Sequence, residues 1–83
     1  MLYASQLRAA RSLLGWSQQE LADKSGVGIA TIRRMEPQTG PVRGISDTVW
    51  RLQGCLEDAG VMFIEDDGVV GPGVRLARSV RSD

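Results

Sequence analysis

The sequence predicts an all-α domain of four helices that ends in a short β-hairpin, and three observations lead to this fold class. Apolar residues recur at helical spacing in four segments between residues 3 and 59. Residues that commonly end helices, namely Gly15, Gly26, Pro37 and Gly60, follow those segments. Beyond Gly60 the pattern changes to a continuous apolar run over residues 61–64, which is typical of a strand.

A first helix is expected over residues 3–14. Its apolar face is formed by Leu7, Ala10 and Leu14, with Leu13 alongside. Trp16 follows this helix and is expected to pack between the first and second helices. We expect both tryptophans, Trp16 and Trp50, to lie in the core.

Two short helices joined by a turn are expected next, over residues 18–25 and 29–35. At the start of the first, Ser17 and Glu20 form an S-x-x-E capping box, in which each side chain bonds a free backbone N–H. Gly26 is expected to end this helix in a left-handed conformation. The second short helix carries an apolar stripe formed by Ile29, Ile32 and Met35. Two helices linked by a short turn that contains glycine form the helix-turn-helix arrangement, whose second helix enters the major groove in DNA-binding examples.

A fourth helix follows the loop at residues 37–44, which is rich in turn-forming residues. Ser46 is a candidate N-cap for this helix, and Gly60 is expected to end it. The residues that define it by helical spacing are Val49, Leu52, Gln53 and Leu56.

The tail is expected to form a hairpin from strands at residues 61–64 and 74–76. Asp66-Asp67-Gly68 has the composition of a turn, and Pro72 and Gly73 would lie just before the second strand. Because an isolated two-stranded hairpin is marginal in water, it must pack on the helices or pair with the same element of another chain. We therefore divide the chain into a helical domain, a hairpin extension and a frayed tail, over residues 1–60, 61–77 and 78–83.

Composition limits the functional classes. The chain has 83 residues, enough for one small domain of marginal stability that dimerisation would help. Up to Gly44, six basic residues outnumber three acidic ones, a net charge of +3, and the rest of the chain carries −3. There is no histidine and one cysteine, Cys55, which we expect to be a buried apolar residue in a reducing cytoplasm. We expect no catalysis, no cofactor, no metal site and no membrane span, and we interpret the acidic residues 65–67 as a solvated turn.

Several segments agree in residue type and spacing with one known family. They are Leu7-Arg8-Ala9-Ala10-Arg11, Leu14-Gly15-Trp16-Ser17-Gln18, Glu20-Leu21-Ala22, Gly26-Val27 and Thr31-Ile32-Arg33-Arg34-Met35-Glu36. Over residues 2–60 the chain closely resembles the xenobiotic-response-element (XRE) family of helix-turn-helix regulators, which are of the Cro and phage-repressor type. The tail resembles the C-terminal extension of many short bacterial members. The resemblance implies a lambda-repressor-like fold.

The resemblance also implies roles by position. Gln18 matches a glutamine that contacts the DNA backbone and braces the recognition helix. Arg11 and Glu36 match an arginine–glutamate pair that ties the first helix to the end of the third, and Arg43 matches a region that commonly touches phosphate. The positions that match those facing the major groove or its flanking phosphates are Gly28, Ile29, Ala30, Arg33 and Arg34.

Four positions depart from the family pattern. Most relatives have Ser or Thr where Gly28 stands, and often Arg, Gln or Ser where Ile29 and Ala30 stand. Pro37 also replaces a polar residue. Apolar side chains offer bases only contact with a thymine methyl, so the polar readout falls on the two arginines of the third helix.

The resemblance implies a sequence-specific DNA-binding transcriptional regulator. We expect a repressor that acts as a homodimer on double-stranded DNA at a palindromic operator. In an alternative interpretation the same fold binds a protein partner, as in antiactivators or antitoxin-like proteins. The zero net charge and the apolar segment at residues 28–30 favour this alternative.

Overall fold

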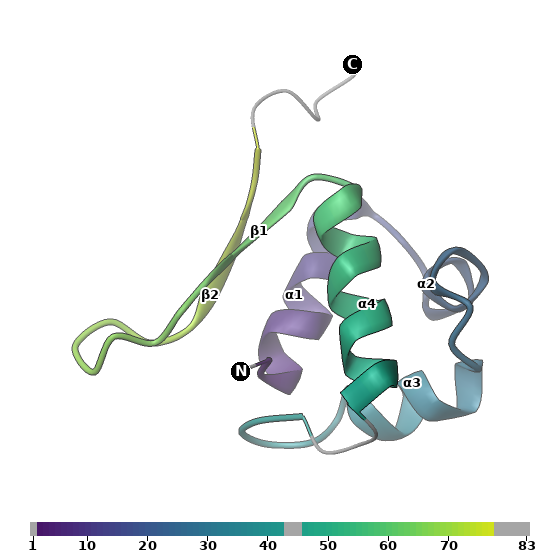
Figure 1. The fold of residues 1–83 in the computed structure, drawn as a ribbon, viewed down its shortest axis with the longest axis horizontal. Coiled ribbons are helices and arrows are strands. Elements are labelled where there is room, and N and C mark those ends of the chain that lie inside the picture. Colours follow the sequence, from purple (N-terminus) through teal and green to yellow (C-terminus); the bar gives the residue numbers. More distant parts are fainter. Residues whose placement is uncertain (1, 43–45, 78–83) are drawn as a thin grey trace.

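The predicted fold class is confirmed by the computed structural model, which describes residues 2–42 and 46–77. The helices are α1 (Ala4–Leu14), α2 (Gln18–Ser25), α3 (Ile29–Met35) and α4 (Ser46–Asp58), and the strands are β1 (Val61–Ile64) and β2 (Gly73–Leu76). Figure 1 shows α4 beside α1, with α2 and α3 on one side of this pair and the hairpin on the other. The predicted frayed tail, residues 78–83, lies outside the described residues.

The ends of the first three helices follow from local side-chain and backbone chemistry. Tyr3 is the N-cap of α1, so that helix begins one residue later than predicted. At the start of α2 the predicted capping box is present, because the Glu20 N–H donates to Ser17 Oγ at 3.0 Å and the Ser17 N–H donates to Glu20 Oε1 at 2.9 Å. Gly26 ends α2 with a φ of 75°, a conformation that glycine adopts without the strain of a side chain.

The start and end of α4 differ in how well the sequence predicted them. Ser46 is the first helical residue rather than the N-cap, and the residue before it lies outside the described part of the chain. At the other end, Gly60 has a φ of 107° and stops the helix as predicted.

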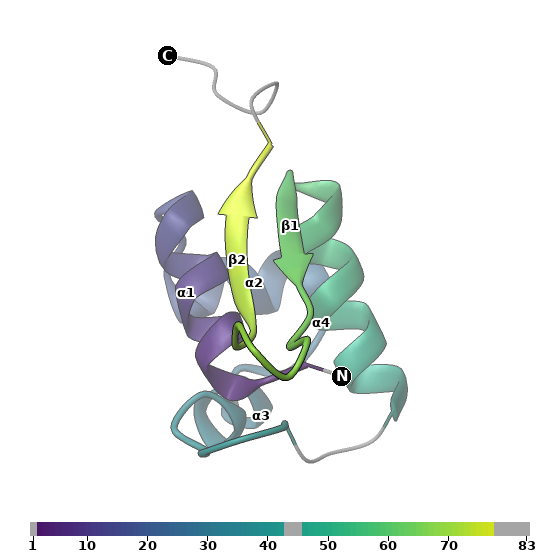
Figure 2. The same cartoon turned by 90° about the vertical axis from the view of Figure 1, so that its left-hand side faces the viewer.

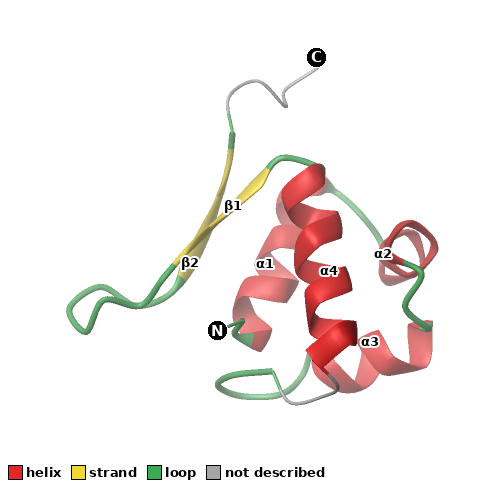
Figure 3. Ribbon diagram, in the orientation of Figure 1, coloured by secondary structure: helices red, strands yellow, loops and turns green. Residues whose placement is uncertain are grey.

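The core lies where the four helices meet (Figure 3). Its largest fully buried side chains come from every helix: Leu7, Leu21, Ile32, Leu52 and Leu56. Truncating one such side chain to alanine typically costs ~2–5 kcal/mol, because transfer and cavity effects add. The apolar stripes of the sequence therefore correspond to the faces that hold the helix-turn-helix together.

The hairpin packs on the helices of its own chain. Its strands are antiparallel, with Val61 opposite Leu76 and Phe63 opposite Val74, and these four side chains pack against the core. The remaining pairs are Met62 with Arg75 and Ile64 with Gly73. Gly73 belongs to the second strand, although it was predicted to precede it. Figure 2 shows the hairpin lying flat in front of the helices, with its other face turned outward.

Gln6 joins the hairpin to the start of α1. Its side chain is 3 % exposed, and Nε2 donates to the carbonyl oxygens of Ile64 at 3.0 Å and Gly73 at 2.9 Å. Its Oε1 accepts from the Tyr3 N–H at 2.9 Å and thereby caps α1. One buried amide therefore satisfies backbone groups at both ends of the described chain, which a buried polar group must do to avoid a desolvation penalty.

The two tryptophans differ from each other, and the prediction for one of them is wrong. Trp16 is half-buried against the core, with Lys24 Nζ 5.2 Å from the centre of its ring. Trp50 is 79 % exposed. At 100° per residue, Trp50 lies about 160° around α4 from the buried Leu52, so it falls off the core stripe. Cys55 is half-buried and packs against the core rather than lying fully inside it.

Candidate nucleic-acid interface

The turn between α2 and α3 is fixed by backbone and side-chain contacts. The Val27 N–H donates to Ser25 Oγ at 3.1 Å, and the Val27 side chain is buried. Gly28 is the N-cap of α3, with an extended φ of −60° and ψ of 141°, and it supplies no side-chain cap. A Cβ at Gly28 would meet no other atom within 4 Å, so glycine is not required there by packing. Because Gly28 supplies no side-chain cap, the first backbone N–H groups of α3 can donate to another acceptor.

α3 divides into a buried face and an exposed face. Ile32 and Met35 are buried, and Ile29 is half-buried against the core. The positions that are exposed on this helix and its N-cap are Gly28, Ala30, Arg33 and Arg34. The predicted recognition positions therefore share one accessible surface, with the exception of Ile29, whose side chain is partly committed to packing.

The two arginines give this surface its positive charge. Arg34 Nη2 lies 3.4 Å from Thr31 Oγ1, which is a long and weak hydrogen bond. The Arg33 side chain forms neither a hydrogen bond nor an ion pair with any other residue that the structure describes. Both guanidinium groups can therefore turn towards an anionic or hydrogen-bonding partner without breaking a strong contact.

Glu36 anchors the C-terminal end of α3 to α1 and α2. Its side chain is only 4 % exposed. Arg11 forms a two-pronged pair with it, from Nε to Oε2 at 2.7 Å and from Nη2 to Oε1 at 2.9 Å. Gln18 Nε2 donates to the same Oε1 at 2.9 Å. The pair expected between Arg11 and Glu36 is thus present, and Gln18 braces α3 through this carboxylate.

The electrostatics of Glu36 follow from these contacts. Burial raises the pKa of Glu36. The hydrogen bonds from Arg11 and Gln18 and the charges of Arg11 and Arg8 lower this pKa, and their combined effect is larger than that of burial. The net result is a pKa below the ordinary value, so the carboxylate is ionised at neutral pH. The hydrogen bond to Glu36 in turn raises the pKa of Arg11.

Arg8 is a second anchor that the sequence did not single out. Its Nη1 donates to the backbone carbonyl of Glu36 and lies 3.5 Å from the carbonyl of Gln38. These carbonyl groups follow the last turn of α3, where a cation is favourable because the helix dipole is negative there. The signal in the sequence was the position of Arg8 off the apolar stripe of α1, but its partners are about thirty residues away.

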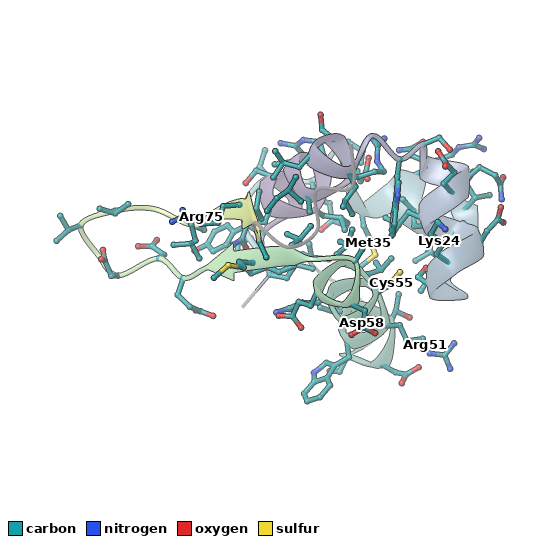
Figure 4. The ribbon with its side chains drawn as sticks, turned by 90° about the horizontal axis from the view of Figure 1, so that it is seen from above. Lys24, Met35, Arg51, Cys55, Asp58 and Arg75 are labelled. Atoms are coloured by element: carbon teal, nitrogen blue, oxygen red, sulfur yellow. The ribbon has the colours of Figure 1, made fainter. Side chains whose placement is uncertain are left out.

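Arg43, the remaining predicted contact, lies outside the described residues. The structure thus brings together Gln18, Gly28, Ala30 and both arginines of α3 around the helix-turn-helix. Two acidic residues, Asp66 and Asp67, lie in the turn of the hairpin, and two more, Glu20 and Asp23, are exposed on α2. Figure 4 shows Lys24 and Arg51 at the end of the molecule that carries α2, and Arg75 on the hairpin at the opposite end.

Residues 2–42 and 46–77 hold no group of three or more acidic, cysteine or histidine side chains that could bind a metal ion. None of the helices in these ranges has the length and apolar character needed to cross a membrane. A hollow of about 390 Å³ lies on α4, lined by Trp50, Gln53, Gly54 and Glu57.

The fold and the brace around Glu36 define a class of structure, the helix-turn-helix domain. Residues 7–36, which run from α1 to the anchor at the end of α3, match the family model described as helix-turn-helix. This model describes the family of XRE, Cro and lambda repressor-type helix-turn-helix proteins, and residues 7–36 are similar to it. No curated protein matches the chain.

Proposed function

We propose that this protein is a sequence-specific DNA-binding transcriptional repressor that acts in the cytoplasm as a homodimer. The observation that carries the proposal is α3 itself, a short helix braced at its C-terminal end by Glu36 and exposing Arg33 and Arg34. A helix of this kind fits the major groove, where arginine can bond guanine O6 and N7.

Different residues support affinity and specificity in this proposal. Gln18 and Arg43 contact phosphates, which position the protein without reading sequence. Gly28 and Ala30 carry almost no side chain, so the start of α3 can approach the bases closely, and Ala30 can touch a thymine methyl. Ile29 makes a smaller contact because part of its side chain packs on the core. Arg33 and Arg34 supply the hydrogen bonds to base edges or flanking phosphates.

The small size of the surface supports a homodimer in this proposal. One seven-residue helix reads only a few base pairs, so a palindromic operator read by two copies adds specificity. Two recognition helices would then enter successive major grooves ~34 Å apart. A dimer bound at a promoter blocks transcription by occupying it.

The alternative function is that the same surface binds a protein partner. An apolar recognition helix would need several exposed apolar side chains to fill a hydrophobic groove. On α3 the largest candidate, Ile29, is half-buried and packs against the core, and the exposed positions are small or basic. The zero net charge of the chain favours this alternative, as do Gly28, Ile29 and Ala30.

The test measures the affinity of the protein for DNA from upstream of its own gene, by fluorescence anisotropy at several salt concentrations. Arg33→Ala and Arg34→Ala are compared with Arg51→Ala, an exposed arginine on α4 that pairs with Asp47 at 3.0 Å. We expect at least one α3 variant to lose ~1–3 kcal/mol of binding free energy, a factor of roughly 5–150, if it bonds a base.

The salt dependence separates the roles of the two arginines. A residue that contacts phosphate lowers the slope of log affinity against log salt by about one when it is removed, whereas a base contact changes discrimination between sequences. The proposal is refuted if the double variant Arg33→Ala/Arg34→Ala binds the DNA as tightly as the unchanged chain. It is also refuted if the unchanged chain gives no change in anisotropy at any salt concentration.

A further inference from the structure

The outer face of α4 carries the most exposed aromatic side chain that the structure describes. Trp50 is 79 % exposed, whereas the other aromatic side chains are partly buried. A tryptophan ring buries a large apolar area when it is covered, so leaving it in water forgoes that stabilisation. Tryptophan is also enriched among the residues that contribute most to protein–protein binding. The exposure of Trp50 therefore indicates a surface that a partner covers.

The hollow beside this ring is formed by α4 alone. Its lining residues, Trp50, Gln53, Gly54 and Glu57, follow one another at spacings of three and four, so they share one face of the helix. Glycine inside a helix is destabilising relative to alanine, and packing does not require it here, because a Cβ at Gly54 would meet no other atom within 4 Å. The absent side chain lets a partner group reach the helix between the ring of Trp50 and the carboxylate of Glu57.

The C-terminal end of α4 carries negative charge that the helix itself does not compensate. Its last turn holds Glu57 and Asp58, both exposed, and no basic residue. The end of a helix is also the negative end of its dipole, where a cation is favourable and a carboxylate is not. Glu57 accepts one long hydrogen bond, from Gln53 Nε2 at 3.3 Å, and the single basic residue of α4, Arg51, pairs with Asp47. The face therefore complements a positive charge.

We propose that this face of α4 binds an arginine in a basic segment of a partner protein, with the guanidinium stacked on the Trp50 ring and paired with the Glu57 carboxylate. A planar guanidinium can stack on tryptophan and donate two parallel hydrogen bonds to a carboxylate, whereas the ammonium group of lysine is a point charge. Trp50 and Glu57 lie seven residues apart, which is ~10 Å along the helix axis. Two side chains of this length can converge on one group in the hollow above Gly54.

The charge and shape of this face favour a basic protein segment over other occupants. The phosphates of a nucleic acid or of an anionic lipid would meet Glu57, Asp58 and the negative end of the helix dipole. A small cation would stay largely in water, because one helix lines the hollow and ligand pockets enclose most of their ligand.

The face is separate from the proposed DNA-binding surface. Trp50 points away from the core, and α4 lies nearer the viewer than α3 in Figure 1 and at the outer edge of the helices in Figure 4. A partner on the outer face of α4 therefore leaves the recognition helix open. The inference goes beyond the proposed function and does not rest on it.

The test is a titration of the full chain, labelled with ¹⁵N and free of DNA, followed by the NMR signals of its N–H groups. The probe is an acetylated and amidated peptide that carries three arginines separated by glycines. We expect the indole signal of Trp50 and the amide signal of Gly54 to shift until they saturate. The indole of Trp16, which is half-buried beside Lys24, is the internal reference and should not move. The same peptide with citrulline in place of arginine, which keeps the shape without the charge, should shift neither signal.

Three variants locate the contact, with the Gly54 amide as the signal in each. Trp50→Ala removes the ring and should weaken binding by a factor of roughly 2–5, the range of an exposed cation–π contact. Glu57→Gln keeps the shape and removes the charge, and it should weaken binding about twofold. Asp23→Asn is the matched control and should leave the affinity unchanged. Asp23, like Glu57, is an exposed carboxylate that accepts from the glutamine four residues before it.

Several results would overturn the proposal. One is an arginine peptide that moves neither the Trp50 indole nor the Gly54 amide, and another is a citrulline peptide that moves them equally. A third is an Asp23→Asn variant that loses as much affinity as Glu57→Gln while circular dichroism shows both to be folded. Sedimentation velocity of the peptide-free protein tests whether a second copy occupies the face. If the unchanged chain self-associates and Trp50→Ala abolishes this association, the occupant is a second copy and the proposal fails.

Discussion

Replacing Glu36 by glutamine should destabilise the protein far more than a change of one surface charge. The carboxylate accepts three hydrogen bonds, two from Arg11 and one from Gln18, and its side chain is 4 % exposed. A glutamine keeps the shape but turns an amide NH₂ towards one of these donors. It also leaves Arg11, which is 23 % exposed, without its counter-charge.

The size of the effect follows from the burial of the pair. Removing one partner of a fully buried ion pair costs ~3–5 kcal/mol. Solvent reaches part of Arg11, so we expect about 2–3 kcal/mol for Glu36→Gln. Domains of this size have a total stability of ~4–12 kcal/mol, and each kcal/mol shifts Tm by ~4–8 °C. The melting temperature should therefore fall by roughly 10–20 °C.

The assay is urea and thermal unfolding followed by far-ultraviolet circular dichroism, at one protein concentration because a dimer would make stability concentration-dependent. Asp47→Asn serves as the control. It breaks the pair of Arg51 and Asp47, whose side chains are 57 % and 70 % exposed, and should change the free energy of unfolding by less than ~1 kcal/mol. A Glu36→Gln variant as stable as the Asp47→Asn variant would refute the view that this carboxylate holds α3 in place.

Three other predictions concern different groups. The pKa of Glu36 in the folded state lies below its ordinary value of 4.5, so the ionised carboxylate contributes fully to the free energy of unfolding above pH 4.5. This contribution is lost as the pH falls through the folded-state pKa. In acid denaturation, the difference in free energy of unfolding between the unchanged chain and Glu36→Gln should therefore shrink below about pH 4.5. Gln6→Ala removes bonds to three backbone groups and should cost ~1–3 kcal/mol, with hydrogen exchange accelerating in the hairpin before α4; equal acceleration in both elements would contradict this. Burial, followed by the charge of Asp58, raises the pKa of the Cys55 thiol despite the opposing charge of Lys24. The thiol of the folded protein should therefore react with a disulfide reagent at pH 8 more slowly than the thiol of the protein unfolded in urea. Similar rates in the two states would show that the thiol is accessible in the fold.

Local signals explain why the sequence predicted so much of the helix-turn-helix. Ser17, Glu20 and Gly26 determine where α2 begins and ends through contacts within a few residues, and both its bounds and those of α3 agree with the prediction. The strand at residues 61–64 was also identified, because its change of period is a local property. Capping and periodicity act over short separations, which a single sequence displays directly.

The errors concern contacts between distant residues. The role of Gln6 depends on carbonyl groups 58 and 67 residues further along the chain, and a glutamine in a helix is usually solvated. Trp50 was expected in the core because its side chain is large and apolar, but its position around α4 decided its exposure. At the candidate site, the pairing of Arg11 with Glu36 was available only through family resemblance, and Arg8 carried no comparable signal.

The buried amide of Gln6 also has a consequence for the order in which the chain folds. α1 is synthesised before the hairpin, yet the groups that satisfy Gln6 belong to residues 64 and 73. Residues 2 and 4 likewise bond the backbone at residues 42 and 40. The native contacts of α1 therefore require the hairpin, and such widely separated contacts slow folding because a long loop must close first. We therefore expect α1 to reach its native contacts during synthesis only after the hairpin has left the ribosome.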